Sequence, residues 1–137
     1  MLAPFHYAFP VLDLIATREF YEQQLGASVG RSTEKWMDFD LFGHQLSAHK
    51  VAAMPQVMAE SEVDGQAVPI PHFGVVLEWG EWQALAERLI AQQARFLLKP
   101  QVRFQGQSGE QGTFFVLDPS GNALEFKSFR RPEEMFA

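Results

Sequence analysis

One order of secondary-structure signals occurs twice along the chain, and this repeat limits the possible folds more than any other feature. The stretches "PFHYAFPV" (4–11) and "IPHFGVVL" (70–77) each place a histidine at the head of an apolar run. A segment with helical character follows each run, and short strand-like segments follow that. Self-similar halves indicate two copies of one structural unit that share a core.

The first half predicts a strand, a helix and three further strands. Asp13 is a suitable helix N-cap and Gly26 a suitable stop, with an imperfect apolar stripe of Leu14, Phe20, Tyr21 and Leu25 between them. The turn Gly43-His44 separates the last two strands. The predicted strands are 5–11, 28–31, 35–41 and 45–51.

The second half predicts the same order. The helix spans 81 to about 94, because its apolar residues recur at helical spacing (Trp82, Leu85, Ala86, Leu89, Ile90). "DPSG" (118–121) is a strong turn signal that joins the last two strands as a hairpin. The predicted strands are 72–79, 96–98, 112–117 and 123–129.

The repeat therefore predicts an α+β protein of two tandem β-α-β-β-β modules. We expect the first module over 1–52 and the second over 72–137, within one compact domain. Residues 53–71 lack any period and end in "PIP", which indicates a linker or flexible loop.

Composition excludes several classes of function. The formal net charge of −6 argues against binding to nucleic acid or to anionic membranes, which needs clustered Lys and Arg. The absence of cysteine excludes disulfides, thiolate metal sites and cysteine nucleophiles. We find neither a leader peptide nor an apolar run of membrane-spanning length, and we expect a cytoplasmic protein.

Strand alternation sorts the side chains onto two faces. The large apolar residues of four strands fall on one face, where the helices would pack. The opposite face carries small groups together with His6, His49, His72 and Glu125. If the two halves share one concave sheet, His6 and His72 become symmetry-related and point into one cavity.

Two neutral imidazoles and one carboxylate form a ligand set that suits Fe(II), Mn or Zn. We therefore predict a metal site of His6, His72 and Glu125. Taken singly, each of these residues is more often an ordinary strand residue, and the prediction rests on their joint placement in the repeat. His49 could be a fourth ligand, a base or an ordinary strand-end residue, while His44 lies on a turn.

These stretches resemble the vicinal oxygen chelate superfamily, which includes glyoxalase I, bleomycin and fosfomycin resistance proteins, and extradiol dioxygenases. The resemblance rests on "FHYAFPVLDLIATREFYEQQLG", "PHFGVVLEW" and "DPSGNALEF", and it covers essentially the whole chain. It implies a curved, mostly antiparallel, incomplete-barrel sheet with helices on its outer face. It is much less specific for the reaction.

The resemblance also implies metal ligands at His6, at its repeat His72 and at Glu125 on the final strand. The fourth strand carries a glutamate in many glyoxalases, whereas "GHQLSAH" offers only Gln45, Ser47 or His49. This departure weakens a glyoxalase I assignment. "WMDFDLFGHQLSAH" is similar to small proteins described as predicted extradiol-type dioxygenases.

We therefore expect an enzyme that uses a divalent metal, with Fe(II) favoured and Mn, Zn, Ni or Co possible, on a small vicinal-diol or catechol-like substrate. His49 is the candidate base. Arg103 could orient an anionic group and Phe115 could line the pocket, although a solvated arginine and a core phenylalanine are equally ordinary readings. We read Lys127 as solvent-facing.

Two other functions remain open. A lyase, isomerase or epimerase would use the metal as a Lewis acid without O₂. A resistance-type protein would shield a small apolar ligand and need no metal. We expect a homodimer, because the chain is small and leaves sheet edges exposed, and the ligands could come from one chain or from two.

Overall fold

The computed structural model describes residues 2–137 and divides them into two compact units. One unit comprises the described residues through Gln56 together with Asp118–Asn122, and the other comprises Val57–Leu117 with Ala123–Ala137. Each unit holds one of the two repeated modules. No helix in the described part of the chain is both long enough and apolar enough to cross a membrane.

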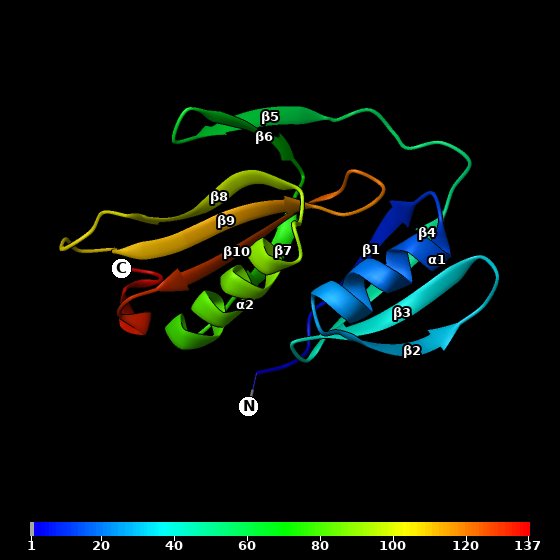
Figure 1. Ribbon diagram of the computed structural model, residues 1–137, viewed down its shortest axis with the longest axis horizontal. Helices are drawn as coiled ribbons and strands as arrows, with labels where there is room; N and C mark the ends of the chain where they lie inside the picture. Colours follow the sequence, from blue (N-terminus) through cyan, green and yellow to red (C-terminus); the bar gives the residue numbers. More distant parts are fainter. Residues whose placement is uncertain (1) are drawn as a thin grey trace. The chain divides into compact units, whose positions relative to one another are not determined.

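The first unit contains a four-stranded sheet in the order β1-β4-β3-β2 (Figure 1). β1 runs parallel to β4, and the other neighbouring strands are antiparallel. Its elements are β1 (His6–Val11), α1 (Leu14–Arg18), a π-helix (Glu19–Gln24), β2 (Ser28–Ser32), β3 (Trp36–Leu41) and β4 (His44–Lys50).

The second unit contains a four-stranded sheet with the same topology, in the order β7-β10-β9-β8. β7 runs parallel to β10, and the other neighbouring strands are antiparallel. Its elements are β7 (Phe73–Val76), α2 (Trp79–Ala91), β8 (Phe96–Arg103), β9 (Gln111–Leu117) and β10 (Ala123–Phe129), followed by a 3₁₀ turn (Pro132–Glu134). The α+β class and the repeated β-α-β-β-β order are confirmed.

Both helices begin at a capping carboxylate. The Asp13 side chain accepts hydrogen bonds from the backbone N–H groups of Ile15 (2.8 Å) and Ala16 (3.0 Å). Glu78 accepts one from the N–H of Glu81 at 3.2 Å, so α2 begins at Trp79, two residues before the predicted start. Gly26 follows the first helical segment with φ of 79°, as expected of a C-terminal glycine.

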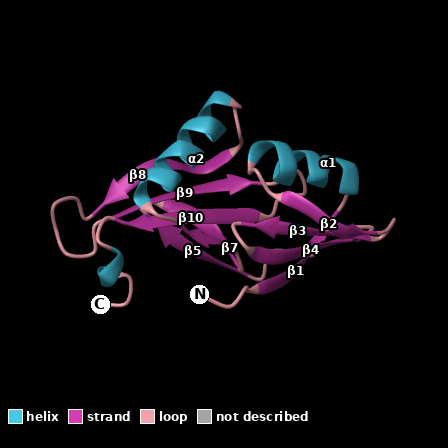
Figure 2. Cartoon of the chain, turned by 90° about the horizontal axis from the view of Figure 1, so that it is seen from below, coloured by secondary structure: helices cyan, strands magenta, loops and turns pink. Residues whose placement is uncertain are grey.

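In each unit the helix covers one face of its own sheet and buries the apolar side of the strands (Figure 2). In the first unit, Phe9, Val11, Phe39 and Ala48 are at most 3% exposed. In the second, α2 contributes Trp82, Leu85 and Leu89 against Phe114, Leu124 and Phe126 of the sheet. The predicted placement of the large apolar residues of β1, β4, β7 and β10 on the helix side is therefore confirmed. On β9 both faces are buried, because Phe114 and Phe115 are each fully buried and Phe115 pairs with Glu125 on the face opposite α2.

The expectation of a linker or loop over 53–71 was wrong for most of that segment. Residues 59–70 form an antiparallel hairpin of β5 (Ala59–Val63) and β6 (Gln66–Ile70). Asp64 and Gly65 both adopt positive φ (48° and 82°), the conformation that suits a two-residue hairpin turn. Val68 of β6 is fully buried with Phe115 and Ala123, so a long-range apolar contact holds a hairpin whose strands show little period of their own.

The strand predicted over 96–98 extends to Arg103, through Pro100. β8 lies at the edge of its sheet, and an edge strand tolerates a proline because one side of its backbone has no partner strand. The register of the pairing between β8 and β9 changes between Leu98 and Gln101, the residues that flank the segment containing this proline.

The turn Asp118–Asn122 joins β9 to β10 but belongs to the first unit. Asp118 is fully buried, and its carboxylate accepts hydrogen bonds from the Tyr21 hydroxyl (2.9 Å), the Ser120 and Asn122 backbone N–H groups and the Asn122 amide. Burial, and secondly the negative charge of Asp118, raise the pKa of Tyr21 well above its ordinary value. Tyr21 therefore stays a neutral hydrogen-bond donor.

Candidate metal-binding and active site

The predicted ligands His72 and Glu125 meet on the face of the second sheet that lies opposite α2. Glu125 of β10 pairs in register with Gly74 of β7, and His72 immediately precedes β7. The His72 Nε2 and Glu125 Oε1 atoms are 3.4 Å apart, and the two side chains are 26% and 16% exposed. These two residues are thus brought together within one unit and remain accessible to solvent.

The remaining polar atom of each side chain already has a partner. His72 Nδ1 lies 2.7 Å from the Pro69 carbonyl oxygen, which can only accept, so Nδ1 carries a proton, and in the neutral ring Nε2 holds the lone pair. The Thr113 hydroxyl donates to Glu125 Oε2 at 2.6 Å. Nε2 of His72 and Oε1 of Glu125 are therefore the atoms that face each other.

A close backbone approach beside Glu125 depends on Gly74. A Cβ built on Gly74 would lie 1.5 Å from the Glu125 carbonyl oxygen, so no other residue type fits there without displacing a strand. An adjoining cavity of about 180 Å³ is lined by His72, Phe73, Gly74, Val75, Val76, Glu125 and Lys127. This cavity gives a small molecule or ion access to the His72–Glu125 pair.

The His72–Glu125 donor set fits a divalent metal ion. Two ligands bound at roughly 2.1 Å lie roughly 3.0 Å apart at a right angle and roughly 3.4 Å apart at a tetrahedral angle. The observed Nε2–Oε1 separation of 3.4 Å equals the tetrahedral value and lies a few tenths of an ångström above the right-angle value. The Pro69 carbonyl and the Thr113 hydroxyl supply the outer hydrogen bonds that orient such ligands. Within residues 2–137, no three His, Asp or Glu side chains form a group arranged to hold a metal.

The third predicted ligand, His6, belongs to the first unit. It starts β1 and pairs in register with Gln45 of β4, whose Oε1 lies 2.8 Å from His6 Nδ1. The Gln45 amide nitrogen lies 3.5 Å from Asp38 Oδ2, and Ser47 donates to Asp38 Oδ1 at 2.6 Å. Asp38 was not among the predicted site residues, and it is the register of β3 with β4 and of β4 with β1 that places it on the same face as His6.

The repeat also identifies the fourth-strand residue that corresponds to Glu125. Two residues after His72, Gly74 pairs with Glu125, and two residues after His6, Ala8 pairs with Ser47. Ser47, rather than Gln45 or His49, therefore occupies the equivalent position in the first module. A hydroxyl that donates to Asp38 stands where the second module has a carboxylate.

The other histidines of the first unit have different surroundings. His49 is exposed near the end of β4 and pairs in register with Pro10 and Trp36. It lies on the same face as Gln45 and Ser47, as predicted. His44 Nδ1 accepts a hydrogen bond from the Phe5 backbone N–H at 2.9 Å, so this imidazole anchors the start of the chain to β4.

Arg103 and Phe115 make contacts that account for their positions. Arg103 forms an ion pair with Asp64 at 3.1 Å and lies over the Phe104 ring, 5.1 Å from its centroid. Phe115 is fully buried beneath Val68 and contacts the His72 ring edge-on at 4.9 Å. Arg103 thus ties the β5–β6 hairpin to β8, and Phe115 supports His72 from below.

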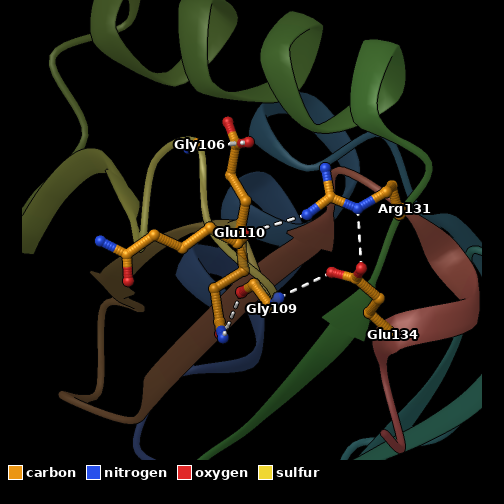
Figure 3. Close-up of polar contacts among 7 residues, drawn as sticks. Gly106, Gly109, Glu110, Arg131 and Glu134 are labelled. Carbon is orange, nitrogen blue, oxygen red and sulfur yellow. Dashed lines mark hydrogen bonds and ion pairs between the residues drawn. The ribbon is translucent and has the colours of Figure 1, made fainter.

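The loop between β8 and β9 is held by the C-terminal segment (Figure 3). Arg131 binds Glu134 at 2.7 Å and donates to the Gln107 carbonyl at 2.7 Å, while Glu134 Oε1 accepts the Gly109 N–H at 2.6 Å. The hydrogen bonds from Arg131, and secondly from the Gly109 amide, lower the pKa of Glu134, and the Glu134 carboxylate raises the pKa of Arg131. We call these four residues the C-terminal clamp.

The pKa of Glu134 gives the clamp a defined pH dependence. The pKa of Glu134 in the folded protein lies below the ordinary value of 4.5. The ionised carboxylate therefore contributes fully to the stability of the fold above pH 4.5, and this contribution is lost as the pH falls through the lowered pKa. Because Gly109 donates to this carboxylate, its amide ¹H and ¹⁵N shifts should titrate with a midpoint below 4.5. The titration should disappear in Glu134→Gln and persist in the neighbouring Glu133→Gln. A midpoint at or above 4.5 would contradict the observed contacts.

Comparison with known proteins supports one family. The family model described as "Glyoxalase/Bleomycin resistance protein/Dioxygenase superfamily" matches residues 4–126. A glyoxalase/bleomycin resistance protein/dioxygenase from Alicyclobacillus acidocaldarius is 29% identical, with a TM-score of 0.80 and coverage of 98% of this chain and 96% of that one. No curated protein sequence matches significantly.

Two more distant structures share the fold. The fosfomycin resistance protein FosX from Listeria monocytogenes is 18% identical, with a TM-score of 0.70 and 98% coverage of both chains. An integron cassette protein from the mobile metagenome of the Halifax Harbour sewage outfall is 20% identical, with a TM-score of 0.69 and coverage of 93% of this chain and 99% of that one.

The repeated topology, with His6 of the first unit and His72 and Glu125 of the second on the sheet faces opposite the helices, defines a protein of the vicinal oxygen chelate class. The chain belongs to the glyoxalase/bleomycin resistance protein/dioxygenase superfamily, since the family model spans nearly its whole length. This superfamily includes enzymes as well as resistance proteins, and its members use divalent metals.

Proposed function

We propose that this protein is a metal-dependent enzyme in which His72 and Glu125 bind a divalent metal ion. The observation that supports this most directly is the 3.4 Å separation of Nε2 and Oε1, with the other polar atom of each side chain bound elsewhere. A His–Glu pair that served only as an ion pair would be expected closer, at roughly 2.7–2.9 Å.

The proposal includes His6 as the third ligand, from the same chain or from a second copy. Its Nδ1 faces the Gln45 amide group, so Nε2 is the ring nitrogen available to a metal, as Nε2 is in His72 beside Glu125. Two histidines and one carboxylate are the set that non-haem Fe(II) oxygenases use. Bound Fe(II) would supply the redox chemistry that O₂ requires.

We propose ring cleavage of a catechol-like substrate in the manner of extradiol dioxygenases as the reaction. The cavity beside His72 and Glu125 provides room next to the ligands, and Val75, Val76 and the stem of Lys127 contribute apolar wall. His49 is the proposed base, because its exposed imidazole lies on the same sheet face as Gln45 and Ser47 and carries a ring nitrogen that can accept a proton. A homodimer and a small-molecule substrate complete the proposal.

The first experiment is metal analysis of protein purified without oxygen and then loaded with Fe(II). We expect about one metal per chain, and a loss of at least about tenfold in affinity for His72→Ala and Glu125→Ala, because each removes a direct ligand. His6→Ala tests the third ligand in the same way. His44→Ala is the matched control, since His44 is occupied by the Phe5 N–H and should leave metal content unchanged.

Activity is measured separately as oxygen uptake with catechol. His49→Ala should retain metal and lose turnover, which separates a base from a ligand. Metal binding without oxygen uptake, using Zn, Mn, Ni or Co, would favour a lyase or isomerase instead of a dioxygenase. Wild-type protein that binds no metal after loading would overturn the proposal and leave a small-molecule binding protein.

A further inference from the structure

The polar face of the first sheet carries a hydrogen-bonded chain that ends on His6. β3, β4 and β1 are consecutive neighbours in the first sheet. Asp38 pairs in register with Ser47, and Gln45 pairs with His6 in the adjacent row of the same face. Ser47 donates to Asp38 Oδ1 at 2.6 Å, Asp38 Oδ2 faces the Gln45 amide nitrogen at 3.5 Å, and Gln45 Oε1 contacts His6 Nδ1 at 2.8 Å.

The chemistry of the groups sets the direction of every bond in this chain. An ionised carboxylate can only accept, so Asp38 requires the NH₂ end of Gln45 to face it. The carbonyl end of Gln45 then faces His6, and a carbonyl can only accept. His6 must therefore carry a proton on Nδ1, and in its neutral form it holds the lone pair on Nε2.

We infer that Gln45 is a positioning residue that holds His6 in its Nδ1–H tautomer, and that Asp38, fixed by Ser47, sets the orientation of the Gln45 amide. The second module reaches the same tautomer by another route, because His72 Nδ1 donates to the Pro69 main-chain carbonyl. In the first module, three side chains thus fix the Nδ1–H tautomer of the histidine, whereas in the second module a backbone carbonyl does so.

The inference explains why the fourth strand of the first module lacks a carboxylate at the position of Glu125. Ser47 occupies that position, and its hydroxyl donates a hydrogen bond to Asp38. The acidic groups of this face, Asp38 and Asp40, lie one strand away on β3; Asp40 accepts the Gly43 N–H, and Asp38 faces the Gln45 amide. A role for His6 Nε2 toward a metal rests on the proposed function, whereas the tautomer itself does not.

The test reads the tautomer directly, from the ring ¹⁵N shifts of His6 in metal-free protein at pH 8. Wild type should show a protonated Nδ1 and an unprotonated Nε2. Gln45→Leu removes the acceptor and should populate the Nε2–H form, while Gln56→Leu, an exposed glutamine elsewhere in the same unit, should leave the spectrum unchanged.

A second test exchanges the carboxylate at position 38 and the amide at position 45. In Asp38→Asn, the new amide can keep its oxygen on Ser47 and offer its NH₂ to Gln45, which should turn the Gln45 amide over and favour the Nε2–H form of His6. The double variant D38N/Q45E supplies a carboxylate that accepts from both neighbours, so it should restore the Nδ1–H form. A role limited to packing would not produce this reversal.

Metal affinity is measured on the same variants by Zn²⁺ titration. We expect a loss of about tenfold or more in Gln45→Leu and in Asp38→Asn, as for other outer-shell partners of histidine ligands, and recovery in D38N/Q45E. An unchanged His6 tautomer in both single variants would overturn the inference, even if wild type binds metal normally. The expected tautomer changes in a wild-type protein that binds no metal would support the inference and refute only the proposed function.

Discussion

Gly74→Ala should abolish stable folding or cost at least about 3 kcal/mol in the free energy of unfolding, the upper range for overpacking in a tightly packed interior. The added Cβ would lie 1.5 Å from the Glu125 carbonyl oxygen and 2.6 Å from the carbonyl carbon. These are backbone atoms of a paired strand, so no side-chain rotation can relieve the overlap. β7 must separate from β10, and His72 must move away from Glu125.

Chemical denaturation of wild type and variant measures this loss. Gly30→Ala is the matched control, because Gly30 also lies in a strand and its added Cβ would meet no atom closer than 3.5 Å. The control should change stability by less than about 0.5 kcal/mol. Similar losses in the two variants would show that the close approach at Gly74 does not decide the packing of β7.

Asp118→Ala should lower the free energy of unfolding by about 3 kcal/mol, because it leaves the buried Tyr21 hydroxyl and several partly buried N–H donors without an acceptor. The carboxylate is fully buried and receives the Tyr21 hydroxyl together with the Ser120 and Asn122 N–H groups. Tyr21 lies 97 residues away in the sequence, so the bond ties the β9–β10 turn to the first helical segment. Removal of Asp118 therefore affects the turn and the helix together.

Two variants calibrate this prediction in urea denaturation. Tyr21→Phe removes one of the bonds and should cost about 1 kcal/mol. Asp40→Ala removes a carboxylate that accepts a single exposed N–H, from Gly43 at 2.8 Å, and should cost less than Asp118→Ala by at least about 1.5 kcal/mol. An Asp118→Ala effect no larger than that of Asp40→Ala would contradict the buried network.

The sheet faces were predictable because strand periodicity is local and the repeat supplies it twice. Alternation alone placed Glu125 and Gly74 on one face and Leu124 with Phe126 on the other, as the register confirms. The capping role of Asp13 was also predictable, since a capping side chain needs only its own next residues.

Other elements depended on contacts that no local pattern reveals. The β5–β6 hairpin was missed because Glu60, Ser61 and Glu62 show no apolar alternation, and its anchors, Val68 and Val63, pack against the distant Phe115. "DG" at 64–65 was the available turn signal. Arg103 has an acidic partner, Asp64, only because this hairpin packs beside β8.

The sequence by itself determined the repeated modules, the polar sheet face and the candidate ligands on it, because each follows from periodicity and residue type. Only the tertiary structure decided which atoms of those ligands are free. The Pro69 carbonyl reaches His72 by way of a tightly turned segment, Thr113 reaches Glu125 from the neighbouring strand, and Gln45 reaches His6 across 39 residues. Hydrogen bonds of this kind depend on how separate strands meet in register, and the order of residues along one strand does not specify that.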